Sequence, residues 1–254
     1  MGQETVSFTT RSGDTLHGVL HQAAGGVPRG AAILCHGMES AKNSEKLIFL
    51  AESLAARGIL ALRFDFRYVG ESSGNFADIT YSGEVEDLQA AYEVIQIRQP
   101  GKTAIFGSSM GGTVALLFAA QKAHDAGVAA VVTLAAPLHP ENFPRRVLTP
   151  DQLQSWRQCG YTSYHGQRLN VSLLEDLERL DVPQAVRRIG CPVLILHGEA
   201  DEVVPVAEAH ELHELLTSPK RLSIFKDTDH RFSNPEVMRR AMTAALDWLT
   251  EHVS

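Results

Sequence analysis

Short apolar runs alternate with longer amphipathic stretches along most of the chain. The runs lack the strict apolar–polar alternation of a strand with one solvent-facing side, which indicates strands that are buried on both faces. In the stretches between them, apolar residues recur every three or four positions, the spacing of a helix with one buried face. The predicted buried strands are residues 31–35, 59–64, 104–106, 128–134, 191–196 and 221–225. The predicted helices are residues 44–57, 81–98, 112–120, 207–216 and 235–252.

The chain opens with a different pattern. Residues 4–9 and 15–21 have strand character and are separated by a turn sequence, Arg11-Ser12-Gly13-Asp14, so they predict an antiparallel hairpin. The later strands alternate with helices, an order that favours a parallel sheet covered on both faces. Together these elements predict an α/β fold with a mostly parallel, eight-stranded sheet flanked by helices.

The alternation of strands and helices stops between residues 138 and 183. Thr149 followed by Pro150 is typical of a helix start, and His165-Gly166 fits a two-residue hairpin turn. The segment is longer than a connecting loop needs and shorter than a domain, so we predict a small cap insertion over the functional site. Because no linker-like or low-complexity run interrupts the sequence, residues 1–254 are expected to form a single domain.

The amino-acid composition limits which binding partners and which cellular location we expect. The chain has 23 Lys and Arg against 30 Asp and Glu, a net charge of −7, which argues against nucleic acid or an anionic membrane surface. No apolar run reaches the roughly 20 residues of a membrane span, and no secretory signal is visible. The three cysteines are widely spaced, and we expect free thiols, with Cys35 and Cys191 buried. A cytoplasmic location is therefore expected.

The residues around Ser109 predict the functional centre. Gly107-Ser108-Ser109-Met110-Gly111 fits the pattern G-x-S-x-G, in which a serine occupies a sharp turn between a strand and a helix and its hydroxyl faces solvent. Glycines two positions to either side let the two backbones approach closely. The pentapeptide alone is a weak signal, but a predicted strand precedes it and a predicted helix follows it. Ser109 is therefore the candidate nucleophile.

Asp201 and His230 also follow predicted strands. Since the carboxyl ends of parallel strands share one edge of the sheet, Ser109, Asp201 and His230 should meet there. Their order along the chain fits His230 as general base and Asp201 as the carboxylate that orients it.

Other residues compete for these two roles. His36 and His197 also end predicted strands, but each precedes a glycine and fits better as a residue that holds a loop by hydrogen bonds. Glu199 and Glu202 stay open as alternatives to Asp201.

Several motifs resemble those of the α/β-hydrolase superfamily, and together they extend over nearly the whole chain. They are His36-Gly37-Met38, Asp65-Phe66-Arg67, Gly70-Glu71-Ser72, Gly107-Ser108-Ser109-Met110-Gly111, His197-Gly198-Glu199-Ala200-Asp201 and Asp229-His230. Within the superfamily, the small cap and the first two motifs look most like small-cap carboxylesterases of the feruloyl or cinnamoyl esterase type. Tyr68-Val69-Gly70-Glu71-Ser72 departs from the Gly-His-Gly-x-Ser that often stands in that family, and we expect the departure to bear on substrate shape.

The resemblance implies a serine hydrolase that cleaves apolar or aromatic, feruloyl- or cinnamoyl-like carboxylic esters by a Ser-His-Asp acyl-enzyme mechanism, with a small-molecule ester as its partner. It also implies an oxyanion hole made by the backbone N–H groups of Met38 and Met110. The N–H group of Met110 would lie at the start of a helix, where the helix dipole favours negative charge. An acyl thioesterase, a peptidase, a carbon–carbon bond hydrolase and a hydrolase-like binding protein stay open as alternatives.

Aromatic side chains of the cap are the candidates for contact with the substrate. They are Phe143, Trp156, Tyr161 and Tyr164.

We expect no metal and no cofactor. His210 and His213 do not complete the H-E-x-x-H zinc pattern, because Glu214 follows. Gly101-Lys102-Thr103 lacks the earlier glycine of a phosphate-binding loop and is followed by a strand. For the oligomeric state, a homodimer is left open.

Overall fold

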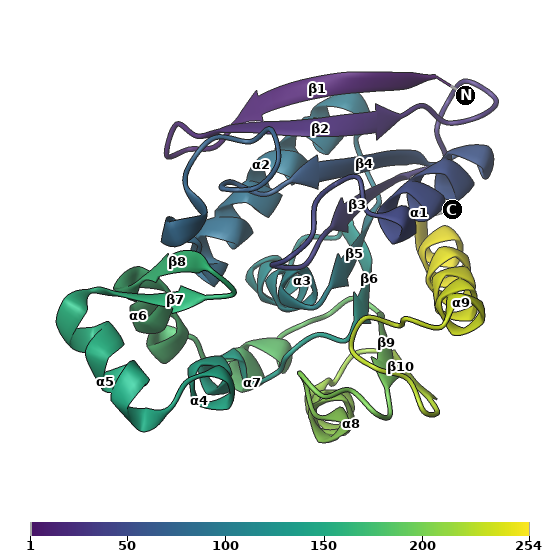
Figure 1. Ribbon diagram of the computed structural model, residues 1–254. Coiled ribbons are helices and arrows are strands. Elements are labelled where there is room, and N and C mark those ends of the chain that lie inside the picture. Colours follow the sequence, from purple (N-terminus) through teal and green to yellow (C-terminus); the bar gives the residue numbers. More distant parts are fainter. Residues whose placement is uncertain (1, 254) are drawn as a thin grey trace.

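One mostly parallel sheet forms the centre of the protein (Figure 1). The computed structural model describes residues 2–253. The strands of the sheet are β1 (Gln3–Thr9), β2 (Thr15–His21), β3 (Ala31–Cys35), β4 (Leu60–Asp65), β5 (Thr103–Ser108), β6 (Val128–Leu134), β9 (Val193–Gly198) and β10 (Lys220–Phe225). Their order is β1-β2-β4-β3-β5-β6-β9-β10. β2 pairs antiparallel with β1 and β4, and the other neighbours are parallel, so the predicted fold class is confirmed.

Helices cover both faces of this sheet (Figure 1). They are α1 (Glu45–Ala56), α2 (Tyr81–Arg98), α3 (Met110–Gln121), α8 (Val206–Leu215) and α9 (Pro235–Val253). α1 and α9 contribute to the apolar core on one face, and α2, α3 and α8 contribute to the core on the other. All five were predicted, with ends that differ by a residue or two, because each carries a regular apolar stripe such as Leu47, Leu50 and Leu54 of α1.

The predicted cap segment lies between β6 and β9, and its green elements stand to the left of the sheet in Figure 1. It holds two short helical turns, η2 (Pro140–Asn142) and α4 (Phe143–Val147), then α5 (Pro150–Cys159), β7 (Tyr161–Tyr164), β8 (Gln167–Asn170), α6 (Val171–Arg179) and α7 (Val182–Val186). Thr149 caps α5 together with Gln152, as its sequence predicted. His165 and Gly166 have φ of 48° and 78° and join β7 to β8, so the predicted hairpin turn is confirmed.

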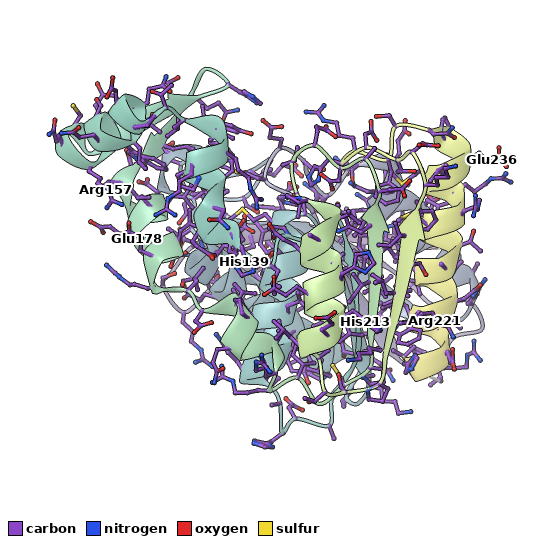
Figure 2. The ribbon with its side chains drawn as sticks, turned by 90° about the horizontal axis from the view of Figure 1, so that it is seen from below. His139, Arg157, Glu178, His213, Arg221 and Glu236 are labelled. Atoms are coloured by element: carbon purple, nitrogen blue, oxygen red, sulfur yellow. The ribbon has the colours of Figure 1, made fainter. Side chains whose placement is uncertain are left out.

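α6 is an element that we did not predict. Leu173, Leu174 and Leu177 give it a clear apolar face, but it is only nine residues long and begins directly after β8. The surface ion pair between Arg157 on α5 and Glu178 on α6 (Figure 2) is about half exposed and adds little stability. The cap therefore holds together mainly by burial of its own apolar side chains.

The structure also tests the expectations about membranes and cysteines. Among residues 2–253, none of the helices combines the length and apolar composition that a bilayer crossing requires. Cys35, Cys159 and Cys191 are free thiols. Cys35 is buried as predicted, whereas Cys191 is only partly buried.

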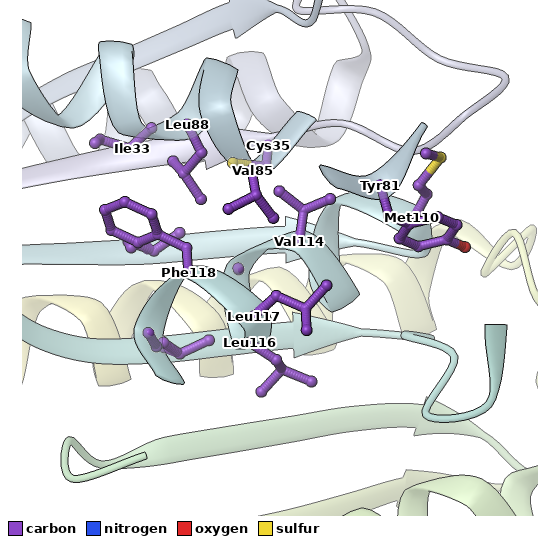
Figure 3. Close-up of a cluster of buried hydrophobic side chains, with 14 of the residues drawn as sticks. Ile33, Cys35, Tyr81, Val85, Leu88, Met110, Val114, Leu116, Leu117 and Phe118 are labelled. Carbon is purple, nitrogen blue, oxygen red and sulfur yellow. The ribbon is translucent and has the colours of Figure 1, made fainter. Parts of the chain in front are cut away.

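One carboxyl group lies in the core without a hydrogen-bond partner among the described residues. Glu84 on α2 is 1% exposed, and neither of its carboxyl oxygens is paired. It shares α2 with Val85 and Leu88, which pack against α3 in the apolar cluster of Figure 3. Burial raises the pKa of Glu84 well above its ordinary value, and the negative charge of Asp87 raises it further.

We expect Glu84→Gln to increase the free energy of unfolding at pH 8 by at least about 1 kcal/mol and to change it little at pH 4. In the unfolded chain a glutamate ionises above a pH of about 4.3. The folded protein keeps Glu84 protonated, so the wild type loses stability as pH rises, and the amide removes that loss. Urea unfolding at the two pH values measures the effect.

Glu86→Gln, two residues further along α2, is the matched control. Glu86 pairs with Arg67, and its pKa is lowered, with hydrogen bonds from Arg67 and Ser12 outweighing the effect of burial. Its loss should therefore reduce stability at pH 8. A Glu84→Gln protein that is less stable than the wild type at pH 8 would contradict our interpretation of the core.

Candidate active site

Ser109 alone makes the turn from β5 to α3. Its φ of 51° and ψ of −123° lie in a region that glycine favours and that a residue with a Cβ adopts only under strain. The turn is fixed on both sides, since the Ser109 N–H donates to the Leu134 carbonyl at 2.7 Å and the Ser109 carbonyl accepts from the Gly112 N–H at 2.8 Å. The turn places Ser109 in the wall of a cavity.

Glycines around this turn allow backbone to pass very close to backbone. A methyl group on Gly107 would lie 2.2 Å from the Gly111 carbonyl oxygen, and one on Gly111 would lie 2.2 Å from the carbonyl oxygen of His36. Both distances are far below van der Waals contact, so only glycine fits at either position.

Ser109, His230 and Asp201 form a chain of hydrogen bonds. Ser109 Oγ lies 3.0 Å from His230 Nε2, and His230 Nδ1 lies 2.8 Å from Asp201 Oδ2. The three residues come from the carboxyl-terminal ends of β5, β9 and β10, where the sequence placed them. The contacts fit an imidazole that donates its Nδ1–H to Asp201 and accepts the Ser109 hydroxyl at Nε2.

Asp201 is held in one orientation by several donors. Its Oδ1 accepts the backbone N–H groups of Val203 and Val204 at 2.9 and 2.7 Å. Burial by itself raises the pKa of Asp201, but hydrogen bonds from His197 and His230 outweigh burial and bring the pKa well below its usual range. The carboxylate is therefore ionised next to the imidazole at neutral pH.

The residues that competed for these positions lie elsewhere. His36 Nδ1 donates to the Gly37 carbonyl at 2.8 Å while its Nε2 accepts the Phe66 N–H, and His197 Nε2 donates to the Val204 carbonyl at 2.9 Å, so both hold loops. Glu202 accepts the backbone N–H of His230 at 3.2 Å, and Glu199 accepts that of Asp227 at 3.3 Å. Of the three carboxylates considered, Asp201 is the one on the His230 ring.

The two positions named for the oxyanion hole, Met38 and Met110, both line the cavity. Met110 is the first residue of α3, so its N–H has no acceptor one turn earlier in the helix. Met38 follows Gly37, which packs so closely that a methyl group there would lie 3.3 Å from Cβ of Ser109. Both residues therefore lie in the cavity wall near Ser109.

The cavity has a volume of about 820 Å³ and lies between the sheet edge and the cap. Phe143 and Tyr164, two of the four aromatic residues predicted to contact substrate, line it, with ring centroids 5.2 Å apart in an edge-to-face arrangement. The other two predictions are wrong. Trp156 is fully buried inside the cap, and Tyr161 is 47% exposed with the Arg168 guanidinium 4.1 Å above its ring. A sequence identifies aromatic residues in a cap but not which face of the cap they occupy.

Residues 68–72, which depart from the family pattern, do not line the cavity. Instead, Ser72 donates to the Asp65 carbonyl at 2.6 Å, and Glu71 pairs with Lys42 at 2.5 Å. The segment therefore lies outside the cavity wall, and its effect on substrate shape stays a prediction.

Family models match the chain in two adjacent parts. The family described as serine aminopeptidase, S33, matches residues 26–158, and the dienelactone hydrolase family matches residues 160–252. The first match covers more than half of the chain. The chain belongs to this family of α/β-hydrolases.

Known proteins support the same assignment of this α/β-hydrolase. It is 29% identical to the uncharacterized protein YfhR of Salmonella typhi over 89% of this chain and 74% of YfhR. The solved esterase domain of a Rhodothermus marinus protein is 26% identical, with a TM-score of 0.77 and full coverage of both chains. Est1E from Butyrivibrio proteoclasticus, solved with ferulic acid bound, has a TM-score of 0.84 over 98% of this chain and 99% of its own, but at 19% identity it shows only a shared fold.

Several cavity residues of the hydrolase were not predicted. Tyr81, Lys46, His139, Arg146 and Arg231 all line the cavity. Tyr81 lies beside Met110 at the end of the apolar cluster in Figure 3, and His139 lies between the cap and α8 in Figure 2. None belongs to a recognisable motif, and only Arg231 had a local signal, its position next to His230. Within residues 2–253, no group of three or more His, Cys, Asp or Glu is arranged to hold a metal ion.

The strained turn predicts an unusual effect of substitution. We expect Ser109→Gly to be more stable than Ser109→Ala by about 1–2 kcal/mol, because glycine adopts the backbone conformation of residue 109 without strain. Both variants lose the same hydroxyl and its bond to His230, so their difference isolates the effect of Cβ. Urea unfolding of the two variants measures it, and an alanine variant at least as stable as the glycine variant would rule out strain at this turn.

Proposed function

We propose that this α/β-hydrolase cleaves carboxylic esters through an acyl-enzyme formed on Ser109. The observation that carries the proposal is the chain of hydrogen bonds from Ser109 Oγ through His230 to Asp201, with lengths of 3.0 and 2.8 Å, in the wall of the cavity. A hydroxyl, an imidazole and a buried carboxylate in this order are the arrangement that nucleophilic acyl transfer requires.

Each group would act in turn. His230 Nε2 accepts the Ser109 proton as Oγ bonds to the ester carbonyl carbon, and Asp201 stabilises the imidazolium that forms. His230 then returns the proton to the alcohol oxygen as the carbon–oxygen bond breaks, leaving the acyl group on Ser109. A water molecule, deprotonated by the same nitrogen, attacks the acyl-enzyme, releases the acid and restores the Ser109 hydroxyl.

Backbone donors would stabilise the negative oxygen of the tetrahedral intermediate. The N–H groups of Met38 and Met110 are the proposed oxyanion hole, and the first turn of α3 adds the favourable end of a helix dipole. One such donor contributes about 3–4 kcal/mol to transition-state stabilisation.

The composition of the cavity supports ester rather than peptide substrates. An aminopeptidase must bind a substrate ammonium group, which calls for a free carboxylate in the cavity. The two carboxylates there are already engaged: Glu39 pairs with His165 and Arg231, and Glu202 accepts the His230 N–H. Similarity to the Rhodothermus marinus esterase domain supports the same conclusion.

The cap favours an apolar or aromatic group on the substrate. Phe143 and Tyr164 provide an aromatic wall, and Val147 and Leu148 extend the apolar surface beside them. A cinnamoyl-like acyl group would match this wall in size and polarity. The free cysteines fit a cytoplasmic location, which is part of the proposal.

Replacement of the nucleophile tests the reaction. Ser109→Ala should lower kcat for 4-nitrophenyl butyrate by about four orders of magnitude while the circular dichroism spectrum is retained. A fluorophosphonate probe should label Ser109 in the wild type and leave the variant unlabelled. Ser155→Ala, which replaces an exposed serine on α5 that does not line the cavity, should retain activity. Full activity of Ser109→Ala would end the proposal.

A second substitution tests the aromatic wall. Phe143→Ala should lower kcat/KM for methyl ferulate about tenfold relative to methyl butyrate, since the ring contact favours the aromatic substrate. Tyr161→Ala removes an aromatic cap residue that lies outside the cavity, so it should leave the ratio unchanged. The same assay with thioester and aminoacyl-amide substrates separates esterase from thioesterase and peptidase activity. Equal losses for both esters in Phe143→Ala would contradict the assigned wall.

A further inference from the structure

Lys46 brings a positive charge to the cavity beside the nucleophile. It lies on the first turn of α1 and lines the same cavity as Ser109. Its Nζ donates to Ser108 Oγ at 2.9 Å, and Ser108 directly precedes Ser109 at the end of β5. The ammonium group is therefore held close to the position where an ester would react.

No carboxylate of the described residues 2–253 forms an ion pair with this ammonium group. Lys42, four residues earlier, shows the ordinary arrangement for a buried lysine, with Asp65 and Glu71 both 2.5 Å from its Nζ. At Lys46 the bonded partner is a neutral hydroxyl. Burial, together with the smaller effect of the positive charge of Arg231, lowers the pKa of Lys46 to about 8.

An ammonium group has three donors, and the bond to Ser108 uses one of them. A partly buried cation without a counter-ion is destabilised by lost hydration, and an anion placed against it recovers part of that loss. Neither cavity carboxylate forms an ion pair with Lys46, since Glu39 pairs with His165 and Arg231, and Glu202 accepts the backbone N–H of His230. The charge is thus left available for a ligand.

We propose that Lys46 forms a subsite for a carboxylate of the substrate, so that the preferred esters carry an anionic group within reach of the scissile bond. This inference rests on the proposed ester hydrolysis at Ser109. The aromatic wall of Phe143 and Tyr164 would hold the apolar part of the same molecule, and Lys46 would hold its anionic end.

Paired substrates of nearly equal shape isolate the charge. Mono-4-nitrophenyl glutarate and its methyl ester place the carboxylate, or its neutral counterpart, on the acyl side. 4-Acetoxybenzoate and its methyl ester place it on the alcohol side. For each pair we define the charge preference as kcat/KM for the anionic ester divided by kcat/KM for the neutral ester.

The wild type should show a charge preference above one for at least one pair, and Lys46→Met should lower that preference about tenfold. Lys46→Arg, which keeps the charge, should retain most of it. Lys226→Met removes an exposed lysine near the same end of the sheet but outside the cavity, so it controls for long-range charge and should leave the preference unchanged. Equal preferences in the wild type, Lys46→Met and Lys226→Met would overturn the proposal.

The charge preference should also depend on pH. Lys46 carries its charge below its pKa, so the preference should fall as pH rises through about 8. The ratio removes any effect of pH on the reaction that both esters of a pair share. His36 stays neutral over this range, because burial lowers its pKa to about 4. The other charged or titratable groups that line the cavity are Glu39, Tyr81, His139, Arg146, Tyr164, His165, Glu202, His230 and Arg231. A constant preference from pH 7 to 9.5 would contradict the assignment to Lys46.

A binding experiment separates failure of the subsite from failure of the proposed reaction. Monomethyl glutarate should bind Ser109→Ala at least tenfold more tightly than it binds the double variant Ser109→Ala, Lys46→Met, as measured by isothermal titration calorimetry. If the wild type hydrolyses no ester but this difference is found, the reaction is wrong and the subsite stands. If neutral esters are hydrolysed and the difference is absent, the subsite is wrong and the reaction stands.

Discussion

Close approach of three backbone segments at Ser109 constrains the rest of the site. β5, the start of α3 and the loop after β3 meet there so tightly that a single methyl group on Gly107 or Gly111 would overlap a carbonyl oxygen. Ser109 accepts a strained backbone conformation as part of this packing. In return, Ser109 lines the cavity, together with Met38 and Met110. The close packing of these three segments thus causes the backbone strain at Ser109 and also places its side chain at the cavity.

At the same edge of the sheet, the buried negative charge of Asp201 is stabilised by nearby hydrogen-bond donors. Asp201 is buried yet ionised, which is tolerable because two backbone N–H groups and two histidines donate to its oxygens. Those bonds also fix the orientation of the His230 ring, because its Nδ1 is bound to Asp201 and its Nε2 is left to face Ser109. The same hydrogen bonds therefore stabilise the charge of Asp201 and orient the His230 ring.

The cavity wall combines aromatic and positively charged groups. The cap contributes the rings of Phe143 and Tyr164 beside polar residues such as His139 and Arg146, while α1 and the loop after β10 contribute Lys46 and Arg231. A substrate with an apolar body and one anionic end would match both kinds of group. Glu84, buried in the core, gives the contrasting case of an acid with no hydrogen-bond partner among the described residues, and burial raises its pKa well above its ordinary value.

The sequence by itself determined the alternation of strands and helices, the turn at Ser109 and the strand ends that carry Asp201 and His230. These features are encoded locally, in apolar periodicity, in glycines at a tight turn and in the rule that parallel strands share one carboxyl edge. Only the tertiary structure decided which of Asp201, Glu199 and Glu202 bonds the His230 ring, since the carboxylates lie after β9 and the ring lies after β10. It also decided that Trp156 lies inside the cap while Phe143 lines the cavity, and that Lys46 reaches Ser108 from a helix 62 positions earlier. Such contacts depend on how separate helices, strands and loops pack together, and the local sequence of one segment does not determine that packing.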